Sequence, residues 1–462
     1  MMLRFGLFFV VFAFNCSCNF LSAQSRIPFN LLIDDSIQKK QNEKELLAYH
    51  QSLLKKIENP YKKDYTSIYE ERFKYIRETV TSSSTITAQK ANNYLQAIVN
   101  KIVSVNKELQ DKPIRVFFSR SEVPNAYSMG DGSIAINIGL VNFLTTEAEL
   151  AFVICHELAH FYLQHTDKAI KNYVETINST AYQNEVKRLS KQEFNVNKEI
   201  QKIEKTIVFD VKKHSRSNEL EADNWAYRFL KNTQYNTKGV ITCLQVLNNI
   251  DDSLQAQKVK LDSILHFANY QFKKSWLQNE TSIFSKMNHD EEVALTKQEL
   301  DSLKTHPDCL KRIGVLKDSI AKDKNVNDFT ISDSLFYQLK FSFQKEINEN
   351  HFELKAYSKN LFYALYLLQN NQHRAYAIYS IARCFNLMYE AQKNHTLGKY
   401  VDKENRYFSA DYNKILRFID KVKIYELASI NYFFCEQYKS QMQQFPAFMK
   451  EYTVAQKNYQ SN

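Results

Sequence analysis

The chain has 462 residues, of which 44% are hydrophobic and 24% charged, which is typical of a globular protein large enough for two or three domains. Its seven glycines and six prolines argue against a repetitive β architecture and favour long helices. The formal net charge is +10, but Lys and Glu are interspersed along the predicted helices, which indicates solvated helix faces, leaves attraction to anionic surfaces as a second interpretation and argues against a nucleic-acid partner.

The first 23 residues have the three parts of an export signal. Arg4 supplies a charged start, residues 5–14 an apolar core, and Ala23 a small residue at the exit. We therefore expect residues 1–23 to be a signal peptide and the mature protein to be exported, to the periplasm or to an association with the outer membrane.

Two cysteines of this segment, Cys16 and Cys18, leave lipidation open, although the residues before each fit a lipoprotein cleavage site poorly. No later stretch approaches the roughly 20 apolar residues of a membrane span. We therefore expect no transmembrane span in the mature chain, and any membrane association to be peripheral or through a lipid anchor.

Residues 31–110 are polar and carry apolar positions at helical spacing, which predicts helices that pack against a catalytic core. The serines from Ser82 to Ser84 mark a loop between these helices. Residues 114–119 and 133–138 predict strands, the second after a turn signal. Because an edge strand beside a metal site can bind an extended peptide, residues 133–138 are the candidate substrate strand, with an ordinary internal strand as the alternative.

Residues 147–165 predict an apolar helix that carries His156, Glu157 and His160 in the spacing HExxH. Positions four apart on a helix are neighbours on one face, so both imidazoles can reach one ion, with Glu157 beside them. Neutral imidazoles hold Zn²⁺, and a catalytic site leaves one position open for a water whose pKa falls to roughly 7. Glu157 would then take the proton of this water and return it to the leaving amine. The alternative is a pair of core histidines with ordinary hydrogen-bond partners.

Residues 166–214 separate this helix from the next motif and are helix-rich and strongly charged. The segment is too long for a simple connection, so we predict a helical insertion that acts as a lid or flap over the cleft. Just before it, His165 lies about 140° around the predicted helix from His160. This position favours support of a ligand, or a place at the surface, over metal ligation.

A second helix is predicted around residue 219, with apolar residues at the spacing of one helix face. These residues are Ala222, Trp225, Ala226, Phe229 and Leu230. Glu219 and Asp223 lie four apart along the edge of the apolar stripe, and their burial requires a partner. Glu219 is the best candidate for a third zinc ligand, and Asp223 can accept the proton of a ligating imidazole. Glu221 is explained by the preference for acidic residues near a helix N-terminus.

Five cysteines follow the signal segment, and they are sparse and lack the spacing of a metal site. They are Cys155, Cys243, Cys309, Cys384 and Cys435. We expect buried free thiols, with one disulfide between Cys384 and Cys435 as the alternative. Residues 237–256 predict another amphipathic helix, and His289 with the acidic residues after it predicts a solvated turn rather than a second metal site.

From about residue 325 the chain is predicted to be all-helical and is rich in aromatic residues. Residues 362–368, 375–382 and 425–434 alternate Ala and Tyr loosely at helical spacing, as degenerate tetratricopeptide (TPR-like) repeats do. No period of roughly 34 residues emerges, so a plain helical bundle is equally compatible. Such a region would hold a protein substrate or an envelope protein partner.

Four blocks, taken together and in order, resemble the HtpX-like and CAAX-prenyl-protease-like zinc metallopeptidases, metallopeptidase family forty-eight, of the gluzincin type. The blocks are NAYSMGDGSI at 125–134, ELA and HELAH at 149–160, NELEAD at 218–223, and THP with RI at 305–313. In its lack of later membrane spans, the chain resembles the soluble, exported BepA-like branch of that family.

This resemblance implies a site for one Zn²⁺ per chain. It assigns the metal ligands to His156, His160 and Glu219, the catalytic base to Glu157, and support of the site to Asp223. Proteins or peptides would be the substrates.

Two further positions enter through the resemblance alone. His306 matches a family histidine near the metal, which stabilises the oxyanion or caps the zinc in a resting state. Asp131 stands where the family more often has two adjacent glycines, which leaves the conformation of that loop open.

These features predict a mainly α, α+β protein with a zincin-like metalloprotease domain at 24–323, which has a small β-sheet, and an all-helical domain at 324–462. The predicted function is that of an exported zinc-dependent endopeptidase in envelope protein quality control, a substrate class that rests on the resemblance alone. The alternative is a chaperone-like or scaffold protein with a latent or silent metalloprotease site. The presence of Glu157 favours the enzyme.

Overall fold

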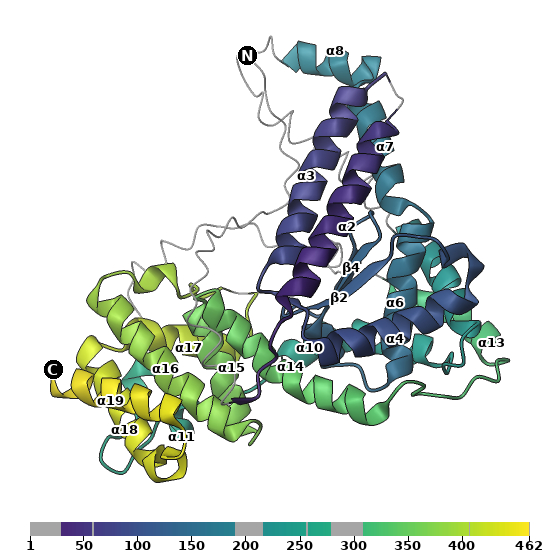
Figure 1. The fold of residues 1–462 in the computed structure, drawn as a ribbon. Coiled ribbons are helices and arrows are strands. Elements are labelled where there is room, and N and C mark those ends of the chain that lie inside the picture. Colours follow the sequence, from purple (N-terminus) through teal and green to yellow (C-terminus); the bar gives the residue numbers. More distant parts are fainter. Residues whose placement is uncertain are drawn as a thin grey trace.

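The computed structural model describes residues 29–57, 60–189, 216–255, 257–278, 308–405 and 407–461. One sheet has the strand order β1-β2-β4-β3, with β1 (Thr85–Ile86), β2 (Arg115–Ser119), β3 (Ala126–Ser128) and β4 (Ser133–Asn137). β2 and β4 are parallel, whereas β1 and β3 run antiparallel to their neighbours. The other long elements are helices, so the protein is α+β and mainly α, as the sequence predicted (Figure 1).

The helices divide into an earlier and a later set. The earlier set is α2 (Ser36–Lys55), α3 (Lys62–Thr81), α4 (Gln89–Val105), α5 (Ile138–Val141), α6 (Glu147–Tyr162), α7 (His165–Ile177), α8 (Thr180–Leu189), an unlabelled helix over residues 216–231, α10 (Gly239–Gln255), α11 (Leu261–Ile264) and α13 (Cys309–Ile320). The later set is α14 (Asp333–Glu353), α15 (Tyr357–Gln369), α16 (Arg374–Lys393), α17 (Ala410–Lys421), α18 (Ile424–Met442) and α19 (Pro446–Gln460). The predicted helix at 237–256 and the loop at 82–84 are confirmed.

Both faces of the sheet are buried, and successive residues of one strand contact different cores because their side chains point to opposite faces. Ile134 and Ile136 of β4 lie in the apolar core that contains α4 and α6. Ala135, between them, packs instead with Leu46 of α2 and Ile76 of α3. The sheet therefore separates the hairpin of α2 and α3 from the helix that carries the HExxH residues.

The two predicted strands are confirmed as β2 and β4, but β4 is internal, between β2 and β3. The expectation that residues 133–138 form an edge strand is therefore wrong, and the internal alternative is correct. The edge is β3, which packs against α6 and pairs through Ala126 with Ile136. Three-residue strands such as β3 carry too few residues to show an alternation in sequence.

The turn between β3 and β4 requires two glycines around Asp131. Gly132 has a φ of +91°, and a Cβ atom there would lie 2.1 Å from the carbonyl oxygen of Pro113. The Asp131 carboxylate accepts hydrogen bonds from the backbone of Ser133 at 2.9 Å and from Arg115 at 2.6 Å. Asp131 therefore stabilises this turn directly, which explains how the loop tolerates it.

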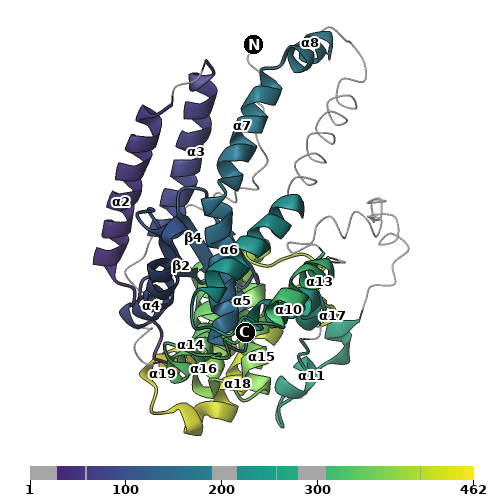
Figure 2. The same ribbon diagram turned by 90° about the vertical axis from the view of Figure 1, so that its right-hand side faces the viewer.

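Helices α2, α3 and α7 stand side by side and project from the rest of the molecule, with α8 at their far end (Figures 1 and 2). Arg72 of α3 and Asp167 of α7 form an ion pair at 3.0 Å, and the Val174 side chain of α7 is buried among Tyr65 and Tyr69. Residues 166–189 of the predicted insertion belong to this group. Residues 190–214 lie outside the described residues, so the lid stays a prediction.

Two large apolar cores organise the described residues. The first contains the sheet, α4, α6, α10 and α14 as far as Ile347. The second contains α15 to α19, together with Phe29, Leu31 and the segment from Val259 to Trp276. The domain limits 24–323 and 324–462 stay predictions, but the change of core occurs within and after α14.

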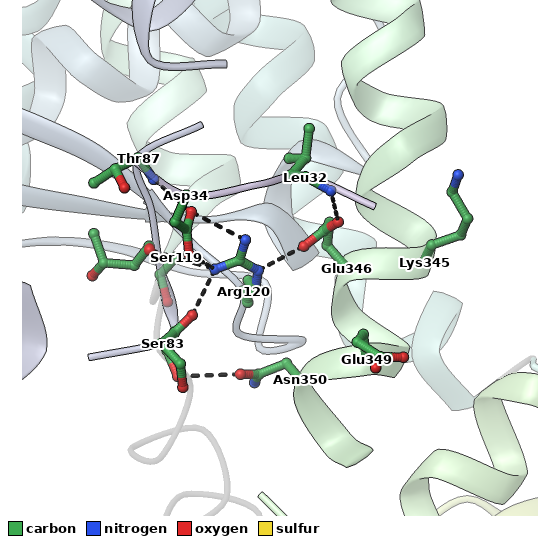
Figure 3. Close-up of polar contacts among 12 residues, drawn as sticks. Leu32, Asp34, Ser83, Thr87, Ser119, Arg120, Lys345, Glu346, Glu349 and Asn350 are labelled. Carbon is green, nitrogen blue, oxygen red and sulfur yellow. Dashed lines mark hydrogen bonds and ion pairs between the residues drawn. The ribbon is translucent and has the colours of Figure 1, made fainter. Parts of the chain in front are cut away.

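Residues 29–34, which we call the N-terminal strap, contact both cores. Phe29 stacks on Tyr379 of α16 with ring centroids 4.7 Å apart. At the other end, Arg120 is fully buried and donates to Asp34 at 2.8 Å and to Glu346 of α14 at 2.6 Å (Figure 3). Glu346 also accepts from the backbone of Leu32 at 2.6 Å. The strap therefore connects the sheet, α14 and the later helices.

The five described cysteines are free and buried, so the expected free thiols are confirmed and the disulfide between Cys384 and Cys435 is not formed. Cys155 is fully buried, and burial raises the pKa of its thiol, in agreement with a core residue. Within the described ranges, no helix is both long enough and apolar enough to cross a bilayer.

Candidate metal centre

α6 carries His156, Glu157 and His160, and its sequence explains why it is a helix in the core. Thr146 and Glu149 form a capping box that satisfies backbone N–H groups at the helix start. Every residue from Glu147 to Ala159 is buried, as the apolar pattern predicted. The His156 imidazole therefore lies inside the protein and that of His160 is partly buried, so both require partners.

Glu147, the first residue of α6, fixes the helix start to three other parts of the fold. Its carboxylate accepts hydrogen bonds from the hydroxyls of Tyr94 on α4 at 2.8 Å and Tyr235 at 2.6 Å. It also accepts from the backbone N–H groups of residues 330–332 just before α14. Burial alone would raise the pKa of Glu147, but these donors lower it, so the carboxylate is charged in the folded protein.

The helix over residues 216–231 packs against α6 and brings Glu219 to the two imidazoles. The Nε2 atoms of His156 and His160 each lie 3.4 Å from a Glu219 carboxylate oxygen and 3.1 Å from one another. One ligand atom from each of the three residues lies within 4.8 Å of the other two. The structure therefore brings together the three residues that the sequence singled out as ligands.

The second ring nitrogen of each imidazole has a protein partner. His156 Nδ1 lies 3.0 Å from Asp223 Oδ1, and His160 Nδ1 lies 2.8 Å from His165 Nδ1. Both Nε2 atoms are thereby left to face Glu219. Metal-binding histidines commonly have this arrangement, with one nitrogen for the metal and the other fixed by a neighbour. Two imidazoles and one carboxylate are a donor set that suits Zn²⁺, so these residues fit a zinc site.

Asp223 is held in turn by Arg312 of α13, which is 2% exposed. The Nε and Nη2 atoms of Arg312 donate to the two Asp223 oxygens at 2.6 and 2.7 Å, and Nη1 lies 3.0 Å from Glu219 Oε2. The sequence named Arg312 only within the fourth block of the resemblance and gave it no role. No spacing rule connects α13 to the other two helices, so the resemblance was the available signal.

The charges of the cluster favour a positively charged occupant. Burial alone would lower the pKa of His156, but Asp223 and Glu219 raise it to about 10. Burial alone would raise the pKa of Glu219, but the two imidazoles and Arg312 hold it well below its ordinary range. The same carboxylates that hold a proton on His156 are available to a divalent cation.

Glu157 lines a pocket beside the cluster and is itself 7% exposed. His156 and Arg312 contribute to the same pocket, and the other lining side chains are apolar, among them Ala126 of the edge strand β3. A carboxylate in this position adjoins both the predicted ligands and the edge of the sheet.

His165 lies closer to the cluster than a continuous helix would allow. α6 ends at Tyr162, Gln164 has a left-handed φ of 57°, and a new helix, α7, begins at His165. His165 is buried and its Nε2 lies 3.3 Å from Glu221 Oε2. The predicted helix to residue 165 is therefore wrong at its end, and of the two roles predicted for His165 the structure favours support of a ligand.

His306 and the residues of the insertion from 190 to 214 lie outside the described residues, so the predictions for them stay predictions. The same holds for His289 and for the export signal at 1–23. The roles given to His156, Glu157, His160, Glu219 and Asp223 also stay predictions. The structure does bring together ligand atoms of His156, His160 and Glu219, with Asp223 beside His156 and Glu157 in the adjoining pocket.

A buried helix with the HExxH spacing, joined by a carboxylate from a second helix, is the arrangement typical of HExxH metallopeptidases. The family model described as Peptidase family M48 matches residues 89–320, half of the chain, and the chain belongs to this family. The matched range covers the sheet strands β2 to β4 and the three helices that carry His156, Glu219 and Arg312. Membership of this family implies metallopeptidase activity, and proteins are the substrates of a peptidase. A search of curated proteins found no match.

Proposed function

We propose that the protein is an exported zinc-dependent endopeptidase with His156, His160 and Glu219 as the ligands of one Zn²⁺. The observation that supports this most directly is the direction of the ring nitrogens: both Nδ1 atoms have protein partners, and both Nε2 atoms face the Glu219 carboxylate. A pair of core histidines without a ligand role would not need a third, acidic group between their free nitrogens.

Glu157 is the proposed general base and acid. Zn²⁺, when bound, would polarise the scissile carbonyl and acidify a water molecule. Glu157 accepts the proton of the attacking water and then donates it to the leaving amine, so one carboxylate serves both halves of the hydrolysis. Its burial beside His156 keeps this proton transfer away from bulk solvent.

The edge strand β3 is the proposed binding site for an extended peptide substrate, in place of β4. Its one pairing among the described strands is with β4, so its outer edge offers backbone N–H and C=O groups to a peptide. Ala126 of β3 lines the pocket that also contains Glu157, so a peptide added to this edge would pass the proposed base.

Quality control of envelope proteins is the proposed biological role, in the periplasm or at the outer membrane. The export signal predicted at residues 1–23 and the resemblance to exported relatives support it. The later helices, from α15 to α19, form a separate apolar core and are the proposed contact for an envelope partner or a protein substrate.

Metal analysis and a cleavage assay test this proposal. We expect the purified protein to contain one zinc per chain and to cleave denatured casein, and a chelator to abolish cleavage. Glu157→Gln should retain zinc and the fold but lose at least about 10²-fold in cleavage rate, because it removes the proton carrier alone. His160→Ala and Glu219→Ala should lose zinc as well.

Cleavage by Glu157→Gln at the wild-type rate would show that the assigned base is wrong. Retention of stoichiometric zinc by both His160→Ala and Glu219→Ala would show that the ligands are wrong. Thermal unfolding of each variant, measured without metal, serves as the control for the fold.

A further inference from the structure

Three acidic residues lie at every second position of the 216–231 helix, and each contacts a different part of the metal centre. Glu219 lies beside the two Nε2 atoms, and Asp223 contacts His156 Nδ1. Glu221, between them, contacts His165 Nε2 at 3.3 Å, and His165 Nδ1 lies 2.8 Å from His160 Nδ1. The general preference of helix starts for acidic residues does not explain the contact of Glu221 with a buried histidine.

We propose that His165 and Glu221 are positioning residues that fix the tautomer and the ring orientation of the zinc ligand His160. The inference rests on the proposed function, because it concerns how one of the proposed ligands is held. Asp223 and Arg312 would do for His156 what Glu221 and His165 do for His160.

The proton positions follow from the contacts. A carboxylate can only accept, so the Nε2 of His165 carries a proton and donates it to Glu221. In a neutral imidazole the other nitrogen is then an acceptor, so the Nδ1 of His165 accepts from the Nδ1–H of His160. His160 is left with a bare Nε2, and this is the nitrogen that faces Glu219.

The opposite direction of these hydrogen bonds would block the metal site. If His165 donated from Nδ1, His160 would accept there and carry its own proton on Nε2, where a metal ligand needs a lone pair. The acceptor on the far side of His165 therefore decides which nitrogen of His160 is free. A carboxylate at residue 221 gives the competent state.

The backbone between the two histidines supports a dedicated role for His165. On a continuous helix the two side chains would point about 140° apart. Instead the chain leaves α6 after Tyr162, passes through the left-handed Gln164 and starts α7 at His165. A left-handed backbone is unfavourable for a non-glycine residue, and here it turns the His165 ring back onto His160.

Zinc affinity of the metal-free protein, measured by competition with a chromophoric chelator, tests the role of His165. His165→Leu fills the site without an acceptor, and we expect about 10–100-fold weaker binding of Zn²⁺. His165→Asn places a carbonyl oxygen where Nδ1 stood, so we expect its affinity to lie within about threefold of the wild type. Thermal unfolding of the metal-free variants monitors the fold.

Substitutions of Glu221 provide a second test. Because this side chain is half exposed, they should disturb folding less than substitutions of the buried His165 do. Glu221→Lys replaces the acceptor by a donor and favours the wrong tautomer of both histidines. Glu221→Ala removes the acceptor, and Asn224→Lys adds a positive charge at an exposed position of the same helix. These two changes together alter the charge as much as Glu221→Lys does, so we expect Glu221→Lys to weaken zinc binding by more than the product of their two effects.

The outcomes separate this inference from the proposed function. If the wild-type protein does not bind zinc, the proposed function fails and the inference with it. If the wild type binds zinc and His165→Leu binds it within about twofold, the inference alone is wrong. Equal losses in His165→Asn and His165→Leu would show that an acceptor at residue 165 does not restore zinc affinity, which would contradict the role given to His165. A Glu221→Lys effect no larger than the combined control would exclude Glu221.

Discussion

Arg312 is a buried cation in contact with the buried carboxylate of Asp223 and the partly buried carboxylate of Glu219. Removing a buried charge leaves its partners uncompensated, which costs far more than the pair contributes in net terms. Arg312→Met should therefore lower the free energy of unfolding of the metal-free protein by about 3–5 kcal/mol. Because a bound cation would supply positive charge to the same carboxylates, the loss should be smaller with saturating zinc. Urea unfolding with chelator and with zinc measures both values.

The neighbouring residue of α13 gives a matched control for this variant. Lys311→Met removes the same charge from a side chain that is 79% exposed, and it should change stability by less than about 0.5 kcal/mol. Arg312→Lys keeps the charge but cannot donate in the same two-pronged geometry, so an intermediate loss is expected. If Arg312→Met were as stable as Lys311→Met, Arg312 would not be the charge that compensates Asp223 and Glu219.

At the scale of single residues, spacing within a helix was informative and contacts between elements were not. The residues His156, Glu157 and His160 follow from positions on one helix, and Glu219 follows from a carboxylate on an apolar stripe. Arg312 comes from a third helix whose approach no periodicity reports. The place of His165 depends on Gln164, and glutamine is not a residue that marks a left-handed turn.

The start of α6 depends on Glu147, whose pKa is lowered in the folded protein despite its burial. A lowered pKa means that the ionised form contributes stability at neutral pH, and this contribution is lost as the pH falls from the ordinary value of 4.5 through the lower folded value. Glu147→Gln should destabilise the protein by about 1–3 kcal/mol at pH 7. The difference between variant and wild type should shrink progressively below pH 4.5.

Urea unfolding between pH 7 and pH 3.5 follows this difference, and Glu70→Gln on the exposed face of α3 is the control. We expect the control to differ little from the wild type at every pH. A constant difference between Glu147→Gln and the wild type across the range would show that hydrogen bonding of the neutral side chain, and not its charge, fixes the start of α6.

At the scale of elements, long helices and the two central strands were predictable because many residues repeat the same pattern. The apolar alternation of residues 133–138 identified a strand correctly, but it could not say which strands lie beside it. β3 has three residues and β1 has two, too few to show a period, so the edge of the sheet was assigned wrongly. Which strands lie beside one another depends on the whole folded sheet, so the residues of one strand do not identify its neighbours.

At the scale of the whole molecule, the described residues form two large apolar cores, and the N-terminal strap, residues 29–34, contacts both. The sequence predicted two regions, but no pattern in it indicated that residues just after the predicted export signal would join them. Lys345 of α14 donates to the backbone carbonyl of Phe29 at 2.7 Å. At the other end of the strap, Arg120 donates to Asp34 (Figure 3). Burial alone would raise the pKa of Asp34, but Arg120 lowers it, so the ion pair is formed at neutral pH.

The two tryptophans report the two cores separately, which makes the strap testable. Trp225 packs against the first core and Trp276 is buried in the second. In single-tryptophan proteins, Trp225→Phe and Trp276→Phe, we expect coincident urea midpoints while the strap is intact. Phe29→Ala should remove roughly 3–5 kcal/mol of packing from the second core, so the Trp276 signal should change at lower urea than the Trp225 signal. Fluorescence of each protein measures the separation.

Ile33 gives the control for this experiment because it belongs to the same strap but is 62% exposed. Ile33→Ala removes apolar atoms from the segment without removing a core contact, so both midpoints should stay together and close to the wild type. Other contacts also cross between the cores, such as the bond from His351 to Glu122 at 3.1 Å. If both signals moved together in Phe29→Ala, those contacts, rather than the strap, would be what makes the two cores unfold as one.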